Sequence, residues 1–183
     1  MHKLLVKLNT VVFVVVLALV PVTIIEAAQT DSVAIKVTIT PSISVNITET
    51  EMLLGSVVAG ATKVSASAVT VTNSGSGINE TYSLSLSNPS GWTASQTAAG
   101  VETYILDTAF DADGASITWS DANHALSTGT PVISSVTKFA GDQTGVSVPY
   151  NVQRKLWFQF KAPTATSVGT EQSIVVTVTA QAD

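Results

Sequence analysis

Apolar and polar side chains alternate along much of this chain with a period of two residues. From Val33 to Ile47 every odd position is apolar, with Pro41 in the middle, and the even positions are mostly polar. The same alternation returns at residues 82–86, 156–161 and 174–180. Because a period of two places successive side chains on opposite faces of a strand, each segment predicts a half-buried β-strand.

Turn-forming residues separate these segments. Clusters of Gly, Pro, Asn and Asp lie at residues 75–77, 88–91, 111–114 and 141–142, and no segment after residue 28 has a convincing helical period. Many short strands without helices predict an all-β fold, an antiparallel β-sandwich. Residues 93–145 have the weakest pattern, and we expect extra strands and long loops inserted there at one end of the domain.

The N-terminus has the three parts of a secretory signal peptide. Lys3 and Lys7 precede an apolar run that Pro21 interrupts, and the small residues Ala27 and Ala28 follow. The run is shorter than the roughly 20 apolar residues that a membrane span needs. We therefore predict a signal peptide at residues 1–28, an N-terminal β arm or first strand at 29–48, and the sandwich at 49–183.

Composition narrows the class of protein. The chain has no cysteine, which argues against a small disulfide-stabilised scaffold and indicates a prokaryotic surface or secreted protein. Its net charge is −5 and it has no basic patch, so nucleic acid is not an expected partner. After signal cleavage no apolar run is long enough to span a membrane.

Short motifs resemble prokaryotic Ig-like domains of the NPCBM-associated kind. They are residues 71–75 (VTNSG), 82–86 (YSLSL), 89–92 (PSGW), 156–163 (LWFQFKAP) and 173–180. The resemblance covers about half of the chain after the signal peptide. It implies an Ig-like sandwich with Trp92 covering the core and with the last two strands paired as a hairpin, and it implies no catalytic residue.

A fainter resemblance connects the chain to exported filament subunits of the TasA and camelysin group. A Gly-containing turn at residues 54–60 (LGSVVAG) precedes a strand that ends in Asn-x-Gly, as in that group. The Pro-Gly-Asp turn typical of the group is Ala59-Gly60-Ala61 here. The resemblance implies a filament subunit that lends an N-terminal strand to its neighbour.

Candidate catalytic chemistry is sparse. After the predicted signal peptide the chain has one His, His124, and one Arg, Arg154, and it contains neither a G-x-S-x-G nor an H-E-x-x-H motif. No set of residues fills the roles of nucleophile, base and stabilising donor, so we expect no enzyme activity. His124, alone in a loop, is expected to be solvated.

The acidic residues of the loop region could bind calcium. Asp111, Asp113 and Asp121 offer the hard oxygen ligands that Ca²⁺ prefers. A helix–loop–helix calcium motif that opened at Asp111 would have Ser116 where it needs Gly and Ala122 where it needs Glu. Turn formation is the favoured interpretation, with calcium as the alternative; no other cofactor is expected.

Two further features suggest surface chemistry. Asn46 and Asn79 each begin a glycosylation sequon, N-I-T and N-E-T. Trp119 and Trp157 could stack on sugar rings in an adhesion or carbohydrate-binding module, although packing in the core or at its rim is the favoured role of each.

The N-terminal arm is the main candidate for assembly. Val33, Ile35, Val37 and Ile39 form an apolar face that pairs within its own domain or is added as a strand to a neighbour. We expect residues 43–48 to pair within the domain and leave both alternatives open for residues 31–40. The sequence thus predicts an exported, non-catalytic surface or matrix protein whose partners are itself, other surface proteins or glycans.

Overall fold

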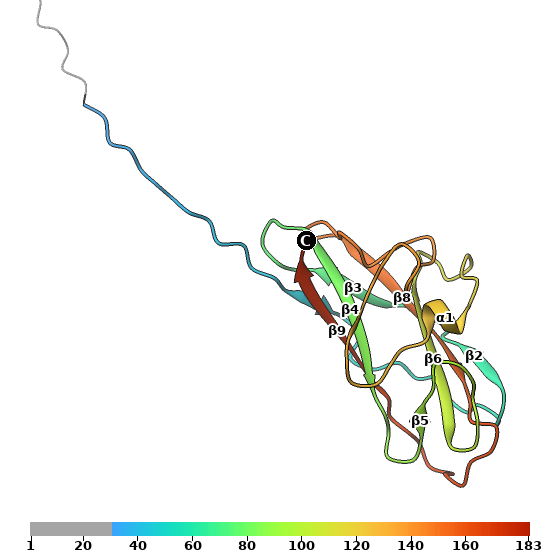
Figure 1. The fold of residues 1–183 in the computed structure, drawn as a ribbon. Helices are drawn as coiled ribbons and strands as arrows, with labels where there is room; N and C mark the ends of the chain where they lie inside the picture. Colours follow the sequence, from blue (N-terminus) through green and yellow to red (C-terminus); the bar gives the residue numbers. More distant parts are fainter. Residues whose placement is uncertain (1–30) are drawn as a thin grey trace, which may run out of the picture. The chain divides into compact units, whose positions relative to one another are not determined.

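The computed structural model describes residues 31–183, and the predicted signal peptide lies outside this range. Residues 39–183 form one compact unit, whereas residues 31–38 belong to a second unit and contain no strand or helix. The fold is all-β, with two sheets and a single turn of helix in the described part (Figure 1). No helix among these residues is long and apolar enough to cross a membrane.

The larger sheet has six strands in the order β1-β3-β8-β6-β5, with β2 also pairing with β8. Their bounds are β1 Val45–Ile47, β2 Thr62–Val64, β3 Val69–Asn73, β5 Thr93–Ala94, β6 Thr103–Phe110 and β8 Gln153–Lys161. All its pairs are antiparallel except β5 with β6. The nine-residue β8 lies at its centre because β2 and β3 pair one after the other along one edge, and β6 pairs along the opposite edge.

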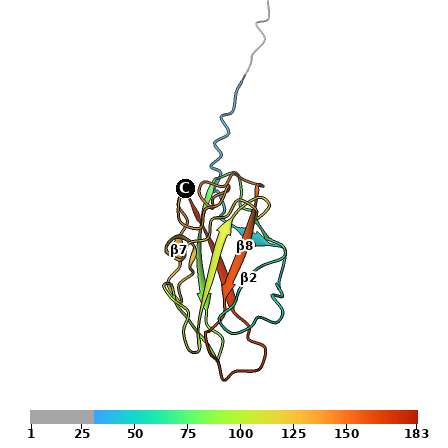
Figure 2. The ribbon, with the colours of Figure 1, turned by 90° about the vertical axis from the view of Figure 1, so that its right-hand side faces the viewer.

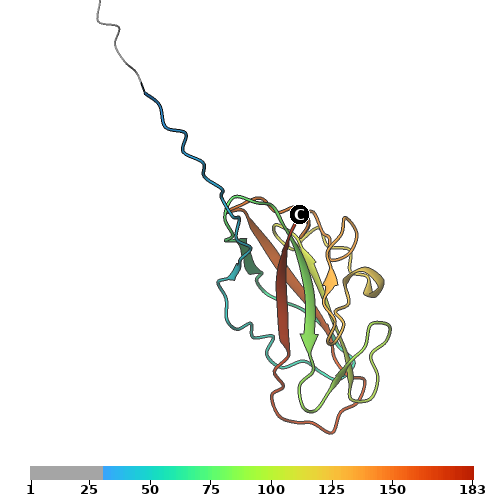
Figure 3. The ribbon, with the colours of Figure 1, turned by 60° about the vertical axis from the view of Figure 1, so that its left-hand side comes forward.

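The smaller sheet has three antiparallel strands in the order β7-β4-β9. They are β4 Glu80–Ser87, β7 Val132–Ile133 and β9 Val175–Ala182. Figure 3 shows β4 and β9 in front of the larger sheet, as a second layer, and Figure 2 shows the same fold from another side. The alternating segments at 82–86, 156–161 and 174–180 all contribute strands, as the sequence predicted.

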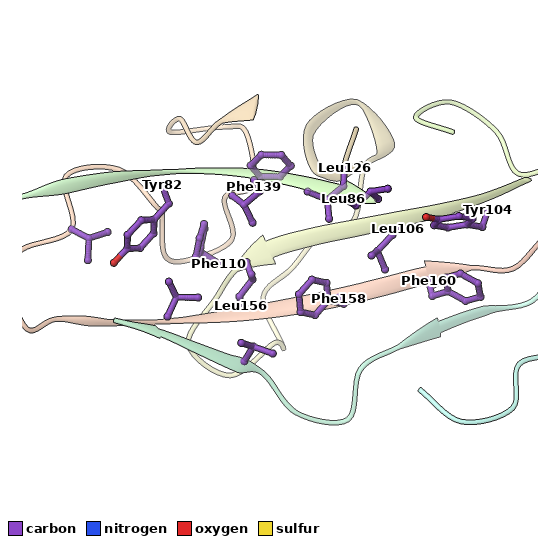
Figure 4. Close-up of a cluster of buried hydrophobic side chains, with 14 of the residues drawn as sticks. Tyr82, Leu86, Tyr104, Leu106, Phe110, Leu126, Phe139, Leu156, Phe158 and Phe160 are labelled. Atoms are coloured by element: carbon purple, nitrogen blue, oxygen red, sulfur yellow. The ribbon is translucent and has the colours of Figure 1, made fainter. Parts of the chain in front are cut away.

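Large apolar side chains from both sheets share one core. Tyr82, Leu84 and Leu86 of β4 meet Leu156, Phe158 and Phe160 of β8 across it. The loops contribute too, because Leu126 and Phe139 are completely buried in the same cluster (Figure 4). Such contacts between the inward faces of two sheets are the main source of stability in a fold of this class.

One sequence expectation was wrong. The last two strands do not form a hairpin, because β8 belongs to the larger sheet and β9 to the smaller one, where it pairs with β4. Residues 93–145 contain β6, which pairs with β8 and whose side chains are almost all buried. Its pattern escaped detection because polar Asp107 and Thr108 are buried beside apolar neighbours on both faces of the strand.

The ladder along β8 is interrupted between β2 and β3. Val64 is paired with Gln159 and Val69 with Leu156, so four residues between β2 and β3 stand opposite two residues of β8. The two extra residues are an even number, so the alternation of faces is kept across the break. Val64 is exposed opposite Gln159, and Val69 is buried in the core beside Leu156.

The two buried tyrosines provide a matched test of the core. Tyr82 and Tyr104 are both fully buried, but the hydroxyl of Tyr82 has no hydrogen-bond partner among the described residues, whereas that of Tyr104 donates to Asn88 Oδ1 at 3.2 Å. Tyr104→Phe should lower the free energy of unfolding by about 0.5–1.5 kcal/mol, and Tyr82→Phe should leave it unchanged or raise it. Urea denaturation of both variants measures the difference, and an equal loss in both would contradict the assignment.

Candidate assembly site

The arm before β1 exposes its whole apolar face. The exposed fractions of Val33, Ile35, Val37 and Ile39 are 84%, 81%, 77% and 84%, respectively. Four large apolar side chains in one exposed row are unusual, because water-exposed apolar surface of this kind normally marks an interaction site. The residues predicted for assembly are therefore highly exposed apolar side chains.

The segment after the arm is held within its own domain, as predicted for residues 43–48. Val45–Ile47 forms β1 and pairs with β3. Just before it, the carbonyls of Ser42 and Ser44 accept hydrogen bonds from the backbone N–H groups of Ser76 and Ser74, both at 2.8 Å. The Ser44 N–H donates to Oε1 of the fully buried Glu80 at 2.8 Å. The chain thus leaves the sheet past the C-terminal end of β3.

Strand β9 has an open edge. It pairs with β4 along its whole length, and no other strand of the described chain pairs along its second side. Its inward side chains Ile174, Val176, Val178 and Ala180 are only half-buried, although they face the core. The corresponding side chains of β4 are fully buried. Cover is therefore missing on the open side of β9.

A groove of about 870 Å³ follows this open edge. Its floor is formed by core residues of the larger sheet, among them Leu106, Phe158 and Phe160. One wall is β9 and the chain that leads into it, and the other is the irregular segment 49–57, which runs past β9 after β1 (Figure 3). Apolar side chains of that segment, such as Met52 and Leu54, are only half-buried.

The irregular wall is anchored at its first residue. The Glu49 carboxylate accepts hydrogen bonds from the Thr48 hydroxyl and from the Thr70 backbone N–H, both at 2.6 Å. These bonds, with that of the Thr48 hydroxyl the largest cause, lower the pKa of Glu49 to about 2. From Glu51 to Val57 the wall has no strand, so the groove is bounded by a segment without a hydrogen-bonded ladder.

The acidic loop is organised by its own backbone. The buried Asp111 carboxylate accepts hydrogen bonds from the backbone N–H groups of Gly114 at 2.7 Å, Asp142 at 3.1 Å and Asp113 at 3.2 Å. Burial alone would raise the pKa of Asp111, but these bonds lower it below the usual value. Hydrogen bonds from an Asp side chain to nearby backbone N–H groups are typical of turns.

The three acidic residues proposed for calcium have different hydrogen-bond and ion-pair partners. Asp121 begins the short helix α1 Asp121–His124 and contacts Lys161, whereas Asp111 and Asp113 bond within their own loop. Within residues 31–183, no three His, Cys, Asp or Glu side chains gather where they could hold a metal ion.

The tryptophans all have protein neighbours. Trp92 stacks on Phe160 with ring centroids 5.9 Å apart, in agreement with its expected role as a cover of the core. Trp157 Nε1 donates to the Asp111 carbonyl at 3.0 Å. Its ring lies under Gly114, where a Cβ atom would come within 2.8 Å of it. Trp119 is half-buried, and its ring lies edge-on to that of His124 with the ring centroids 5.7 Å apart.

His124 is not solvated, contrary to expectation. Only 4% of it is exposed. Its Nδ1 accepts a hydrogen bond from the Ser120 N–H at 3.0 Å, and its Nε2 lies 3.1 Å from the Ala140 carbonyl oxygen. The ring therefore joins helix α1 to a distant loop, an arrangement that local sequence does not reveal.

The two sequon asparagines are exposed. Asn46 lies in β1, and Asn79 donates to the Ser147 hydroxyl at 3.0 Å just before β4. Their glycosylation stays a prediction. Sequence reasoning missed a different polar group, buried Asp107 beside Lys161; a lone acidic residue within the apolar stretch 104–110 (YILDTAF) was its only signal.

Comparison of the chain with protein-family models, with curated proteins and with solved structures gives no match in any of the three.

The Asp111 bonds predict how stability depends on pH. Because its pKa is lower in the folded chain, the ionised carboxylate stabilises the fold above the unfolded pKa of about 3.9, and this contribution is lost as pH falls through the folded pKa. Asp111→Asn should cost about 1–3 kcal/mol at pH 7. The difference in the free energy of unfolding between this variant and the unmodified protein should become smaller below about pH 4.

Denaturation curves between pH 7 and pH 3 measure this gap. Exposed Asp113→Asn serves as the control and should change stability little at any pH. A gap that is constant with pH, or a large loss in the control, would contradict the role of Asp111.

Proposed function

We propose that this chain is an exported, non-catalytic structural protein of the cell surface or extracellular matrix, built on an Ig-like β-sandwich. Copies assemble into filaments by β-strand addition, with the arm of one copy bound in the groove of the next. The observation that carries the proposal is the open groove along β9 in a chain that also has an unpaired apolar strand segment.

The arm and the groove match in length and in side-chain spacing. At about 3.3 Å per residue, Val33 to Ile39 spans about 20 Å, and the eight residues of β9 span about 25 Å. The arm has an apolar side chain at every second position, as an added strand needs when one face covers a core. Its polar face carries Lys36 and Thr38, which would remain in water.

Strand addition satisfies two needs at once. The unpaired N–H and C=O groups of β9 gain partners from the arm, and the half-buried apolar floor of the groove gains cover. Burial of each Val or Ile side chain contributes about 1.5–3 kcal/mol before the arm's ordering entropy is subtracted. Several anchors in register are therefore needed for stable binding.

The occupant is the arm of a second copy rather than the chain's own arm. Ser42 and Ser44 continue the path of β1 beside Ser76 and Ser74, toward the end of β3 and past it. To reach β9 of its own domain, the arm would have to reverse sharply near Pro41, yet the alternation keeps its phase through that position. Unbroken alternation favours one continuous extended segment, and so favours addition to a neighbour.

Other features support a non-catalytic, exported role. The N-terminal pattern supports secretion, and the lack of cysteine suits a prokaryotic surface protein. The alternative function, an adhesion or carbohydrate-binding module using Trp119 or Trp157, has less support, because both rings are half-buried against protein groups.

Substitutions in the arm test the donor side. Val37→Asp places a charge on the face that enters the groove, whereas Thr38→Asp adds the same charge to the opposite face. The first should weaken assembly at least about 10-fold, because one apolar anchor is lost and a charge must be desolvated, and the second should change it little. Electron microscopy and light scattering of the mature protein at several concentrations measure assembly.

Equal effects of the two charges, or filaments that persist after deletion of residues 31–40, would contradict strand donation. Purified protein that stays monomeric at every concentration tested would contradict it too.

The acceptor side has its own matched pair. Val176 lines the groove, whereas the exposed Thr177 next to it in β9 does not. A synthetic peptide of residues 31–44 should bind the domain that lacks residues 31–40, and Val176→Lys should abolish this binding while Thr177→Lys preserves it. Titration by fluorescence anisotropy gives both affinities, and circular dichroism confirms that each variant is folded. A peptide affinity that is unchanged by Val176→Lys, or no binding at all, would rule out this groove as the acceptor.

A further inference from the structure

A buried carboxyl, a lysine and a second carboxyl meet on the outer face of the larger sheet. Asp107 of β6 is paired with Gln159 of β8, and Lys161 lies two residues further along β8 on the same face. This diagonal spacing is within reach of a long side chain. Asp121 enters from helix α1, which lies against β6 because the Leu126 N–H donates to the Leu106 carbonyl at 2.9 Å (Figure 1).

The lysine joins the two acids. Its Nζ lies 3.2 Å from Asp107 Oδ2 and is in direct contact with Asp121 Oδ1. Among residues 31–183, Lys161 is the one cation within ion-pair distance of a carboxylate. The nearby Lys138 is engaged elsewhere, since its Nζ donates to the carbonyls of Ala122 at 3.3 Å and Ala125 at 3.2 Å.

Asp107 is the unusual member of this group. None of its side chain is exposed, and neither carboxyl oxygen has a hydrogen-bond partner in the described chain, because the contact with Lys161 lacks hydrogen-bond geometry. Burial raises the pKa of Asp107 more than Lys161 lowers it. An unsatisfied buried carboxylate is costly, so this group favours gaining a proton from its neighbour.

We propose that Lys161 and Asp121 become joined by an intramolecular amide bond between Nζ and Cγ, and that Asp107 promotes its formation. The Lys161 ammonium first gives a proton to Asp107, and the neutral amine attacks Cγ of Asp121. A C–N bond forms, and Asp107 returns the first proton to an oxygen of the tetrahedral intermediate. The nitrogen then loses a second proton, which Asp107 passes to the same oxygen, so that the C–O bond breaks and this oxygen leaves as water. Ammonium and carboxylate become one amide and one water, with no oxidant or further reactant.

The site meets the physical requirements of this condensation. Burial lowers the pKa of Lys161, but its contacts with Asp121 and Asp107 raise it by more, so this pKa lies above its usual value. The resting amine is therefore protonated and needs a base beside it. Asp107 is in contact with that amine and is shielded from water. Fixed contact between the amine and the carboxyl gives an effective concentration of about 10⁵ M or more. This concentration favours formation of the amide over its hydrolysis by water.

The bond would brace a chain that has no disulfide. The cross-link closes the chain from Asp121 to Lys161 and fastens the helix-containing loop to central strand β8. A covalent tie from this loop to the centre of the larger sheet would resist pulling along a strand-linked filament. The inference itself depends only on the three side chains and stands whether or not the chain forms filaments.

Intact mass spectrometry of the mature protein tests the proposal directly. The protein should be lighter than its sequence by one water. Trypsin should fail to cut after Lys161, and residues 156–183 should remain attached to residues 64–138. Lys161→Arg and Asp121→Ala should restore the full mass. Asp121→Asn should react by losing ammonia and give a product of the same mass as the cross-linked unmodified protein.

Asp107→Asn tests the promoting group, because it leaves both reacting side chains in place. It should keep the full mass while circular dichroism shows a folded protein. Lys155→Arg, which changes a lysine on the same strand outside the cluster, should still lose one water. Full sequence mass and normal cleavage after Lys161 in the unmodified protein would overturn the cross-link, and an Asp107→Asn protein that still loses water would overturn the role of Asp107.

Discussion

The free edge of β9 is the constraint on which the rest of the assembly argument depends. A strand that pairs on one side only leaves backbone N–H and C=O groups open, and here the same side also leaves the core thinly covered. Natural sheets usually protect such an edge with charge, proline or a covering segment. In this chain the irregular segment 49–57 lines the groove beside this edge, and no strand of the described residues pairs there.

The two ends of the first strand segment have different physical roles. Residues 42–47 are fixed by the ladder with β3 and by buried Glu80, so the root of the arm has a defined exit from the domain. Residues 31–40 carry a continuous apolar face whose large side chains are exposed. In the proposed strand addition, a fixed root and an apolar arm would favour directional assembly, since each copy would offer one donor and one acceptor.

Three buried ionisable residues, Asp107, Asp111 and His124, lie within residues 93–145, the region where the alternation is weakest. Each holds loop structure against the larger sheet through backbone groups or through Lys161. Polar burial of this kind replaces apolar packing on the outer face of the sheet, where a two-sheet fold otherwise meets water.

Sequence alone determined the all-β class and the inward faces of β4, β8 and β9, because a period of two is a local property of a strand. Only the tertiary structure decided which strands pair. It placed β8 and β9 in different sheets, paired β6 with β8, opened the groove, and brought Asp107, Asp121 and Lys161 together. Strand order and such contacts join residues far apart in the chain, and local alternation carries no information about those distances.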